Sequence, residues 1–261
     1  MLPTNSLIPI HDDNPTQTFS YLTAALIALN ILAFLLEPQL GGGGSSRVLE
    51  FFYRWGLVPW EITHGQPVSQ EVLRAGGLNV SCSPPACFPG KSVYLSLFSS
   101  MFLHGGIVHL LGNMLFLWVF GNNIEDNLGR LRFVLFYFTT GILASLAHVA
   151  ANGNSVIPTV GASGAIAGLL GAYILLFPRA RITTIVPIFF FLQFLKLPAV
   201  VVLGLWFGYQ FLFGVGQQVG AAGVAWLAHV GGFISGVALI YLFGGRRPAR
   251  PAFPGYEPYR P

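Results

Sequence analysis

The sequence predicts an all-α membrane protein: a bundle of six transmembrane helices with a long, structured first loop on the extracytoplasmic side. Of the 261 residues, 54% are hydrophobic and only 8% are charged, whereas about a quarter of the residues in an ordinary soluble domain are charged. Six separate runs supply the roughly 17 to 25 apolar residues that a helix needs to cross a hydrocarbon core about 30 Å thick. The 32 glycines indicate close contact between neighbouring helices.

Proline, glycine and charge mark the expected ends of these helices. The first helix is expected to stop at Glu37-Pro38, before a flexible run of glycines at 41–44. A turn over 122–132 is expected between the second and third helices, and an apolar stretch from Ile185 to Phe194 precedes the fifth. The predicted helices cover about Phe19 to Leu36, 106–121, 133–151, 161–177, the run from Pro198 to about Phe213, and 221–243.

Three segments make up the predicted domain organisation. They are a polar N-terminal segment over 1–17, the six-helix membrane domain over 18–245, and a basic, proline-rich tail over 246–261 that is expected to be disordered. Residues 1–17 contain no Lys or Arg, so neither a signal peptide nor an Arg-rich transit peptide is indicated. The first loop is expected over about 38–102, and its aromatic and apolar patches predict a structured segment partly in the membrane interface.

Both cysteines of the chain, Cys82 and Cys87, lie in this loop. Two thiols do not complete a zinc site by themselves, which leaves a small disulfide loop or a pair of free thiols. The expected extracytoplasmic location favours the disulfide. No cofactor is predicted. Metal binding by His104 and His109 is not expected, because they are five residues apart and no carboxylate or cysteine joins them.

Six spans place both termini on one side of the membrane, and the Lys and Arg residues identify that side. We predict that both termini are cytoplasmic and that the protein is a multi-pass protein of the bacterial cytoplasmic membrane. The net charge of +4 forms no continuous basic stripe, so the expected partners are lipid and membrane proteins rather than nucleic acid. The sequence does not specify an oligomeric state. The basic residues on the predicted cytoplasmic side are Arg130, Arg132, Arg179, Arg181, Lys196, Arg246, Arg247 and Arg250.

Few polar residues lie inside the predicted spans, where an unsatisfied polar group costs several kcal/mol. No Asp, Glu, Lys or Arg falls within the predicted limits of a span. Asn113, Ser163 and His229 stand early in three helices that all enter from the outer face. This shared depth predicts a water-accessible site that opens to the outside.

The residue types at this depth predict a serine nucleophile and a histidine base, Ser163 and His229. A serine hydroxyl is a weak nucleophile until a base accepts its proton, and neutral imidazole is a suitable base near pH 7. No carboxylate is available in the spans, so a dyad is expected rather than a triad. The expected oxyanion donors are the Ser163 backbone N–H at a helix start and the side chains of His109 and Asn113, which share one helical face.

Small residues are expected to bring this serine and histidine together. Gly161 and Gly164 flank the predicted nucleophile, and Gly164 with Gly168 forms a small-xxx-small surface on the fourth helix. Gly232 and Gly236 form another such surface just below the predicted base in the sixth helix. Close contact between these two helices is the expected result.

The remaining histidines have other interpretations. His104 is expected to support either the first loop or the site. His148 is interpreted as a packed or interfacial residue, because no other polar residue accompanies it. His11 and His64 are expected to be solvated. A channel lined by the polar residues of the second helix is a further alternative, although one polar layer does not make a continuous path.

Three motifs stand in order along the predicted six-span chain. They are His104-Gly-Gly-Ile-Val-His109-Leu-Leu-Gly-Asn113-Met, Gly161-Ala-Ser163-Gly164 and Ala228-His229-Val-Gly-Gly232-Phe-Ile-Ser-Gly236. Together they resemble the rhomboid family, and the similarity covers about residues 19–243. Glu125, in Gly121-Asn-Asn-Ile-Glu-Asp-Asn-Leu-Gly129, matches a further family position after the second helix.

The resemblance implies an intramembrane serine endopeptidase that cleaves single-pass or other transmembrane protein substrates near the outer face. It also implies a dyad of Ser163 and His229, oxyanion contacts from His109 and Asn113, and a substrate gate formed by the fifth helix and the loop before the sixth. A non-catalytic relative that binds and delivers membrane clients is the alternative within the family, and such relatives normally lack the serine or the histidine.

Two positions depart from the family pattern. The residue four after the nucleophile is often aromatic in relatives and stacks on the histidine, and here it is Ala167. Some members carry a Trp-Arg pair in the first loop, where this chain has Tyr53-Arg54-Trp55.

Overall fold

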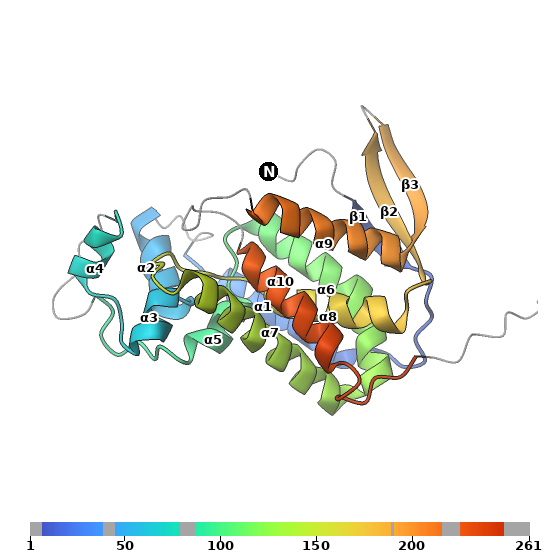
Figure 1. Ribbon diagram of the computed structural model, residues 1–261, viewed down its shortest axis with the longest axis horizontal. Helices are drawn as coiled ribbons and strands as arrows, with labels where there is room; N and C mark the ends of the chain where they lie inside the picture. The colour runs from blue at the N-terminus through green and yellow to red at the C-terminus, as the bar shows by residue number, and fades with distance from the viewer. Residues whose placement is uncertain (1–6, 39–44, 79–86, 189–190, 216–224, 248–261) are drawn as a thin grey trace, which may run out of the picture.

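The computed structural model describes residues 7–38, 45–78, 87–188, 191–215 and 225–247. A bundle of long helices forms its centre, with short helices at one end and a small sheet at the other (Figure 1). We call these the loop end and the sheet end. The helices of the bundle are α1 (Tyr21–Leu35), α6 (Ile107–Leu128), α7 (Arg130–Asn152), α8 (Ser163–Leu176), α9 (Ala199–Val215) and α10 (Trp226–Leu239).

The bundle is a mostly helical membrane fold. Within the described residues, α6 and α7 are long and apolar enough to cross a membrane. Shorter apolar helices accompany them: α1, α8, α10 and the part of α9 over Ala199–Leu212. The count of six spans therefore stays a prediction.

Helix α8 lies at the centre of the bundle, and ten of its residues, from Ala165 to Leu176, are buried. Its contact with α10 is backbone against backbone: a Cβ built on Gly236 would lie 1.9 Å from the Gly168 carbonyl oxygen. A Cβ built on Gly232 would likewise lie 2.1 Å from the Gly164 carbonyl oxygen. The two helices pack this closely only because these positions lack side chains.

Helix α6 is longer than predicted. It continues to Leu128, and only Gly129, with φ of 76°, separates it from α7. The predicted turn over 122–132 is therefore wrong, and Glu125 and Asp126, which were expected in that turn, belong to the last turn of α6. Both carboxylates accept hydrogen bonds from backbone N–H groups of residues 17–23. For Glu125, which is buried, these partners compensate for the desolvation of the carboxylate.

The apolar stretch before the fifth helix forms a β-hairpin. Strands β2 (Arg181–Ile188) and β3 (Phe191–Pro198) pair antiparallel, and β1 (Ile8–Asp12) pairs antiparallel with the other edge of β2. Part of the polar segment over 1–17 is thus an edge strand. The hairpin projects sideways from the sheet end (Figure 1). An ion pair of 2.9 Å between Lys196 Nζ and Asp13 Oδ2 joins it to the segment after β1.

Short helices form a small core of their own at the loop end. Tyr53 is fully buried, stacks on Phe88, and donates a hydrogen bond of 2.8 Å to the Val156 carbonyl oxygen, which ties this region to the connection before α8. Glu61 and Lys91 form a buried ion pair in the same region. The elements here are α2 (Ser45–Trp55), α3 (Pro59–His64), α4 (Gln70–Ala75), α5 (Ser96–Ser99) and the 3₁₀ turn η1 (Ser100–Phe102).

Several predicted features lie outside the described residues. Cys82 is one of them, so its pairing stays a prediction, while Cys87 is disulfide-bonded. The first part of the predicted sixth helix, residues 221–224, and the tail from 248 also lie outside. Helix α10 itself ends at Leu239, four residues before the predicted end at Phe243.

Candidate active site

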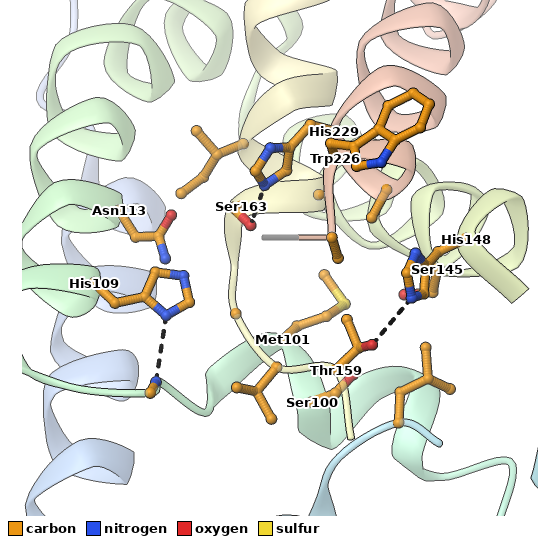
Figure 2. Close-up of a pocket in the computed structure, with 18 of the residues that line it drawn as sticks. Ser100, Met101, His109, Asn113, Ser145, His148, Thr159, Ser163, Trp226 and His229 are labelled. Atoms are coloured by element: carbon orange, nitrogen blue, oxygen red, sulfur yellow. Dashed lines mark hydrogen bonds between the residues drawn. The ribbon is translucent and has the colours of Figure 1, made fainter. Parts of the chain in front are cut away.

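A cavity of about 840 Å³ lies at the loop end, where α6, α8 and α10 begin. Its wall combines these helix starts with residues of η1, the middle and end of α7, the connection 155–161, and two side chains of α9. Figure 2 shows polar side chains from several of these segments facing a common space. The predicted residues of the second, fourth and sixth helices therefore meet in one place.

Ser163 and His229 are in direct contact in this cavity. Ser163 is the first residue of α8, and His229 lies in the first turn of α10. The distance from Ser163 Oγ to His229 Nε2 is 2.8 Å, a normal hydrogen-bond length (Figure 2). His229 is only 7% exposed. The close approach of α8 and α10 at Gly164 and Gly232 lies directly below this pair, as the glycine pattern predicted.

Two residues of α9 that the sequence analysis did not identify lie against the other side of the imidazole. Gln210 Oε1 lies 3.1 Å from His229 Nδ1, and the Trp206 ring lies 5.9 Å from the His229 ring, at an interplanar angle of 36°. Gln210 interrupts the apolar run from Ala199 to Phe213. A polar residue inside an apolar helix is the signal that singled out the other site residues, and it would have identified Gln210 as well.

His109 presents a hydrogen-bond donor toward the nucleophile. The backbone N–H of Gly105 donates to His109 Nδ1 at 3.3 Å (Figure 2), so in the neutral ring the proton is on Nε2. A Cβ built on Gly161, whose φ is +130°, would lie 3.0 Å from His109 Nε2 and 3.5 Å from Ser163 Oγ. Gly161 therefore leaves open the space between the donor and the hydroxyl.

Asn113 supplies a second donor on the same face of α6. The residue is 7% exposed, and its Nδ2 atom has no hydrogen-bond partner among the described residues. A buried amide donor without a partner is unfavourable by about 1 to 3 kcal/mol. Such a group is available for a negatively charged oxygen that forms in the cavity. The start of α8 adds its backbone N–H groups, since its N-cap residue Ala162 makes no side-chain capping bond.

His104 is fully buried behind His109, with 5.2 Å between the ring centroids. Its backbone N–H donates to Glu37 Oε1 at 2.9 Å, at the end of the first helix. It does not line the cavity but packs on His109, which does.

The surroundings of His148 differ from the interpretation made from the sequence, because other polar side chains lie beside it. It lines the same cavity, together with Ser145, Asn152 and Thr159. Its Nε2 atom lies 3.2 Å from Thr159 Oγ1 (Figure 2). The sequence did not reveal this group because its members come from α7 and from the irregular connection that follows it.

Glu125 lies far from the cavity, at the sheet end. Its carboxylate accepts hydrogen bonds from the backbone N–H of Leu22 at 3.0 Å and of Thr23 at 2.7 Å, and from Thr23 Oγ1 at 2.8 Å. This geometry is that of a carboxylate at a helix N-terminus. Glu125 therefore holds the start of α1 against the end of α6.

The arrangement defines a class of chemistry. A hydroxyl hydrogen-bonded to an imidazole, beside two side-chain donors and a helix N-terminus, is the arrangement of a serine hydrolase site: the base accepts the hydroxyl proton and the donors hold the oxyanion. Here it stands at one end of a bundle of apolar helices.

Comparison with known proteins gives the same family that the motifs resemble. The family model for the Rhomboid domain matches residues 91–246. The chain is 31% identical to RHOMBOID-like protein 1 of Arabidopsis thaliana over 158 residues, which are 59% of this chain and 39% of that protein. It is 33% identical to Rhomboid protease GluP of Bacillus subtilis (strain 168) over 159 residues, which are 61% of this chain and 24% of that protein.

The chain also matches Rhomboid protein 1, mitochondrial, of Saccharomyces cerevisiae, with 39% identity over 92 residues. This shorter match covers 34% of the chain and 27% of that protein. The chain belongs to the rhomboid family, which confirms the resemblance. It spans between about a quarter and two fifths of the length of these three relatives.

Proposed function

We propose that this protein is an intramembrane serine endopeptidase that hydrolyses peptide bonds in or near transmembrane segments of membrane-protein substrates. The observation that carries the proposal is the 2.8 Å contact between Ser163 Oγ and His229 Nε2 in a polar cavity of about 840 Å³. Family membership supports it, since one relative is named as a rhomboid protease.

In the proposed mechanism, His229 Nε2 accepts the hydroxyl proton while Ser163 Oγ attacks the substrate carbonyl carbon. The carbonyl oxygen becomes an oxyanion, which accepts hydrogen bonds from His109 Nε2–H, Asn113 Nδ2–H and the N–H groups at the start of α8. The imidazolium then gives its proton to the leaving amine, and an acyl-enzyme remains on Ser163. A water molecule, deprotonated by the same imidazole, hydrolyses this ester and restores the serine.

The proposed placement puts α1, α6, α7, α8, α9 and α10 across the bilayer, as the membrane domain over 18–245. Its loop end faces the outside and its sheet end faces the cytoplasm. This orientation is supported by the basic residues of the sheet end, among them Arg130 at the start of α7 and Lys196 in β3. A cavity at the outer end admits water from that side, while the expected substrates, single-pass or other transmembrane proteins, reach it from the lipid.

The test is cleavage of a reporter membrane segment by purified protein in detergent, together with labelling by a fluorophosphonate probe. Ser163→Ala and His229→Ala should each abolish cleavage, and Ser163→Ala should also remove the labelled site. Matched controls are Ser92→Ala and His64→Ala, at exposed positions of the loop end. Undiminished cleavage in either site variant, with normal thermal unfolding, would refute the proposed function.

The same labelling separates the alternative within the family. A folded protein whose Ser163 does not react with the probe, and which binds membrane segments without cutting them, would be a non-catalytic client-binding relative.

A further inference from the structure

An imidazole acts as a base toward a serine only when the nitrogen that faces the hydroxyl carries a lone pair. A neutral histidine has two tautomers, and the partner of the far nitrogen selects between them. In this site the nitrogen facing Ser163 is Nε2, so the proton must be on Nδ1. Ala167, four residues after Ser163, is fully buried in the contact of α8 with α10 and offers no ring to hold the imidazole.

We propose that Gln210 is the positioning residue that holds His229 in its base form, through its side-chain oxygen; this inference rests on the proposed function. The site would then work with three side chains, from α8, α9 and α10, rather than as an isolated dyad.

The hydrogen-bond geometry carries the proposal. Gln210 Oε1 lies 3.1 Å from His229 Nδ1, and an amide oxygen only accepts. The Nδ1 atom therefore donates, and the lone pair of the neutral ring is on Nε2, 2.8 Å from Ser163 Oγ. The two bonds act on opposite sides of one ring, so together they fix its rotation as well as its tautomer.

Helix α9 also supplies an aromatic ring beside the imidazole. Trp206 stands four residues before Gln210, so both side chains lie on one face of α9. The Trp206 ring lies 5.9 Å from the imidazole, and a further ring contact of 4.5 Å between Phe207 and Phe233 holds α9 against α10. These contacts give Gln210 a fixed position relative to His229.

A neutral amide suits this position better than the carboxylate of a triad. His229 is buried, and an ionised carboxylate beside it would lose its hydration, a penalty of several kcal/mol that must be recovered from its partner. The amide oxygen gives the same acceptor at a much smaller desolvation penalty. It orients the base without placing a charge in an apolar bundle.

The experiment compares three variants by kcat, KM and rate of fluorophosphonate labelling. Gln210→Met keeps the length and volume of the side chain but removes the acceptor, and Gln210→Glu keeps an acceptor oxygen. Gln193→Met is the matched control, because Gln193 is exposed in β3, far from the cavity. Thermal unfolding of each variant reports whether packing has changed.

We expect kcat and the labelling rate of Gln210→Met to fall about tenfold, which corresponds to about 1.4 kcal/mol, with KM within about twofold of the wild type. Gln210→Glu should recover most of the loss, and Gln193→Met should behave as the wild type. A packing role predicts the opposite order, because Met fills the space and Glu adds a charge. Wild-type labelling of Gln210→Met, or a loss that follows its thermal midpoint, would overturn the assignment.

The outcomes for this inference and for the proposed function can be distinguished. If Ser163→Ala abolishes cleavage while Gln210→Met does not change it, the protease stands and the role of Gln210 falls. If the wild type itself neither cleaves nor is labelled, the proposed function falls, and this inference falls with it.

Discussion

The contact between α8 and α10 can be tested by adding a single methyl group. A Cβ built on Gly232 would lie 2.1 Å from the Gly164 carbonyl oxygen, a backbone atom that has no rotamer to change. The substitution Gly232→Ala must therefore move one helix away from the other. Because ordinary van der Waals contact begins at about 3.4 Å, the required separation is about 1.3 Å.

This displacement is large compared with the catalytic contact. His229 stands three residues before Gly232 on α10, and its Nε2 lies 2.8 Å from Ser163 Oγ. If α10 moves as a rigid body along the line between these two atoms, that distance increases to about 4.1 Å, beyond hydrogen-bond reach. A misplacement of about 1 Å reduces turnover by about a hundredfold, and overpacking of this kind destabilises a protein by about 1 to 3 kcal/mol.

The assay measures fluorophosphonate labelling of Ser163, reporter cleavage and the thermal midpoint in detergent. Gly204→Ala in α9 is the control, because nothing lies within 4 Å of a Cβ built there. It should keep wild-type activity. If Gly232→Ala labels Ser163 at the wild-type rate with an unchanged midpoint, the reasoning from close backbone contact is wrong.

Three further predictions concern a donor, a buried acid and an ion pair. Asn113→Ala should lower kcat by about a hundredfold or more, the scale of one oxyanion donor, with KM little changed; an unchanged kcat would remove Asn113 from the mechanism. Burial raises the pKa of Asp12, which accepts a hydrogen bond from Tyr173, from 3.8 to about 6, so the folded state binds this proton more tightly than the unfolded chain. Asp12→Asn should therefore be more stable than the wild type at pH 7, and the difference in thermal midpoint should vanish as the pH falls toward 4; a constant difference would contradict this. Lys91→Met leaves the carboxylate of Glu61 buried without its partner and should destabilise the protein by about 3 to 5 kcal/mol, whereas adding Glu61→Gln should recover most of the loss, as thermal unfolding would report.

The residues of the candidate site were predictable because hydrocarbon penalises polar groups strongly. Asn113, Ser163 and His229 were visible as polar residues at one depth in separate apolar runs, and the structure brings all three to one cavity. The glycine spacing in the fourth and sixth helices likewise pointed to the close contact that the structure has. Such arguments need only the sequence, because the membrane imposes the same penalty whatever the fold.

Other features depended on partners distant in the chain. The run from Ile185 to Phe194 is apolar except for Gln193, and periodicity does not separate a short strand from a helix in such a run. Pairing of β2 with β1 and β3 decides the outcome. The end of α6 was misplaced because the partners of Glu125 and Asp126 lie about a hundred residues earlier.

By itself, the sequence determined that the protein is a mostly helical membrane protein of the rhomboid family and which polar residues are expensive to bury. Only the tertiary structure decided what lies beside the imidazole, because the packing of α9 against α10 places Gln210 Oε1 3.1 Å from His229 Nδ1. Burial energies depend on residue type and so can be read along the chain, whereas a hydrogen bond depends on distance and direction, which exist only once the helices have packed.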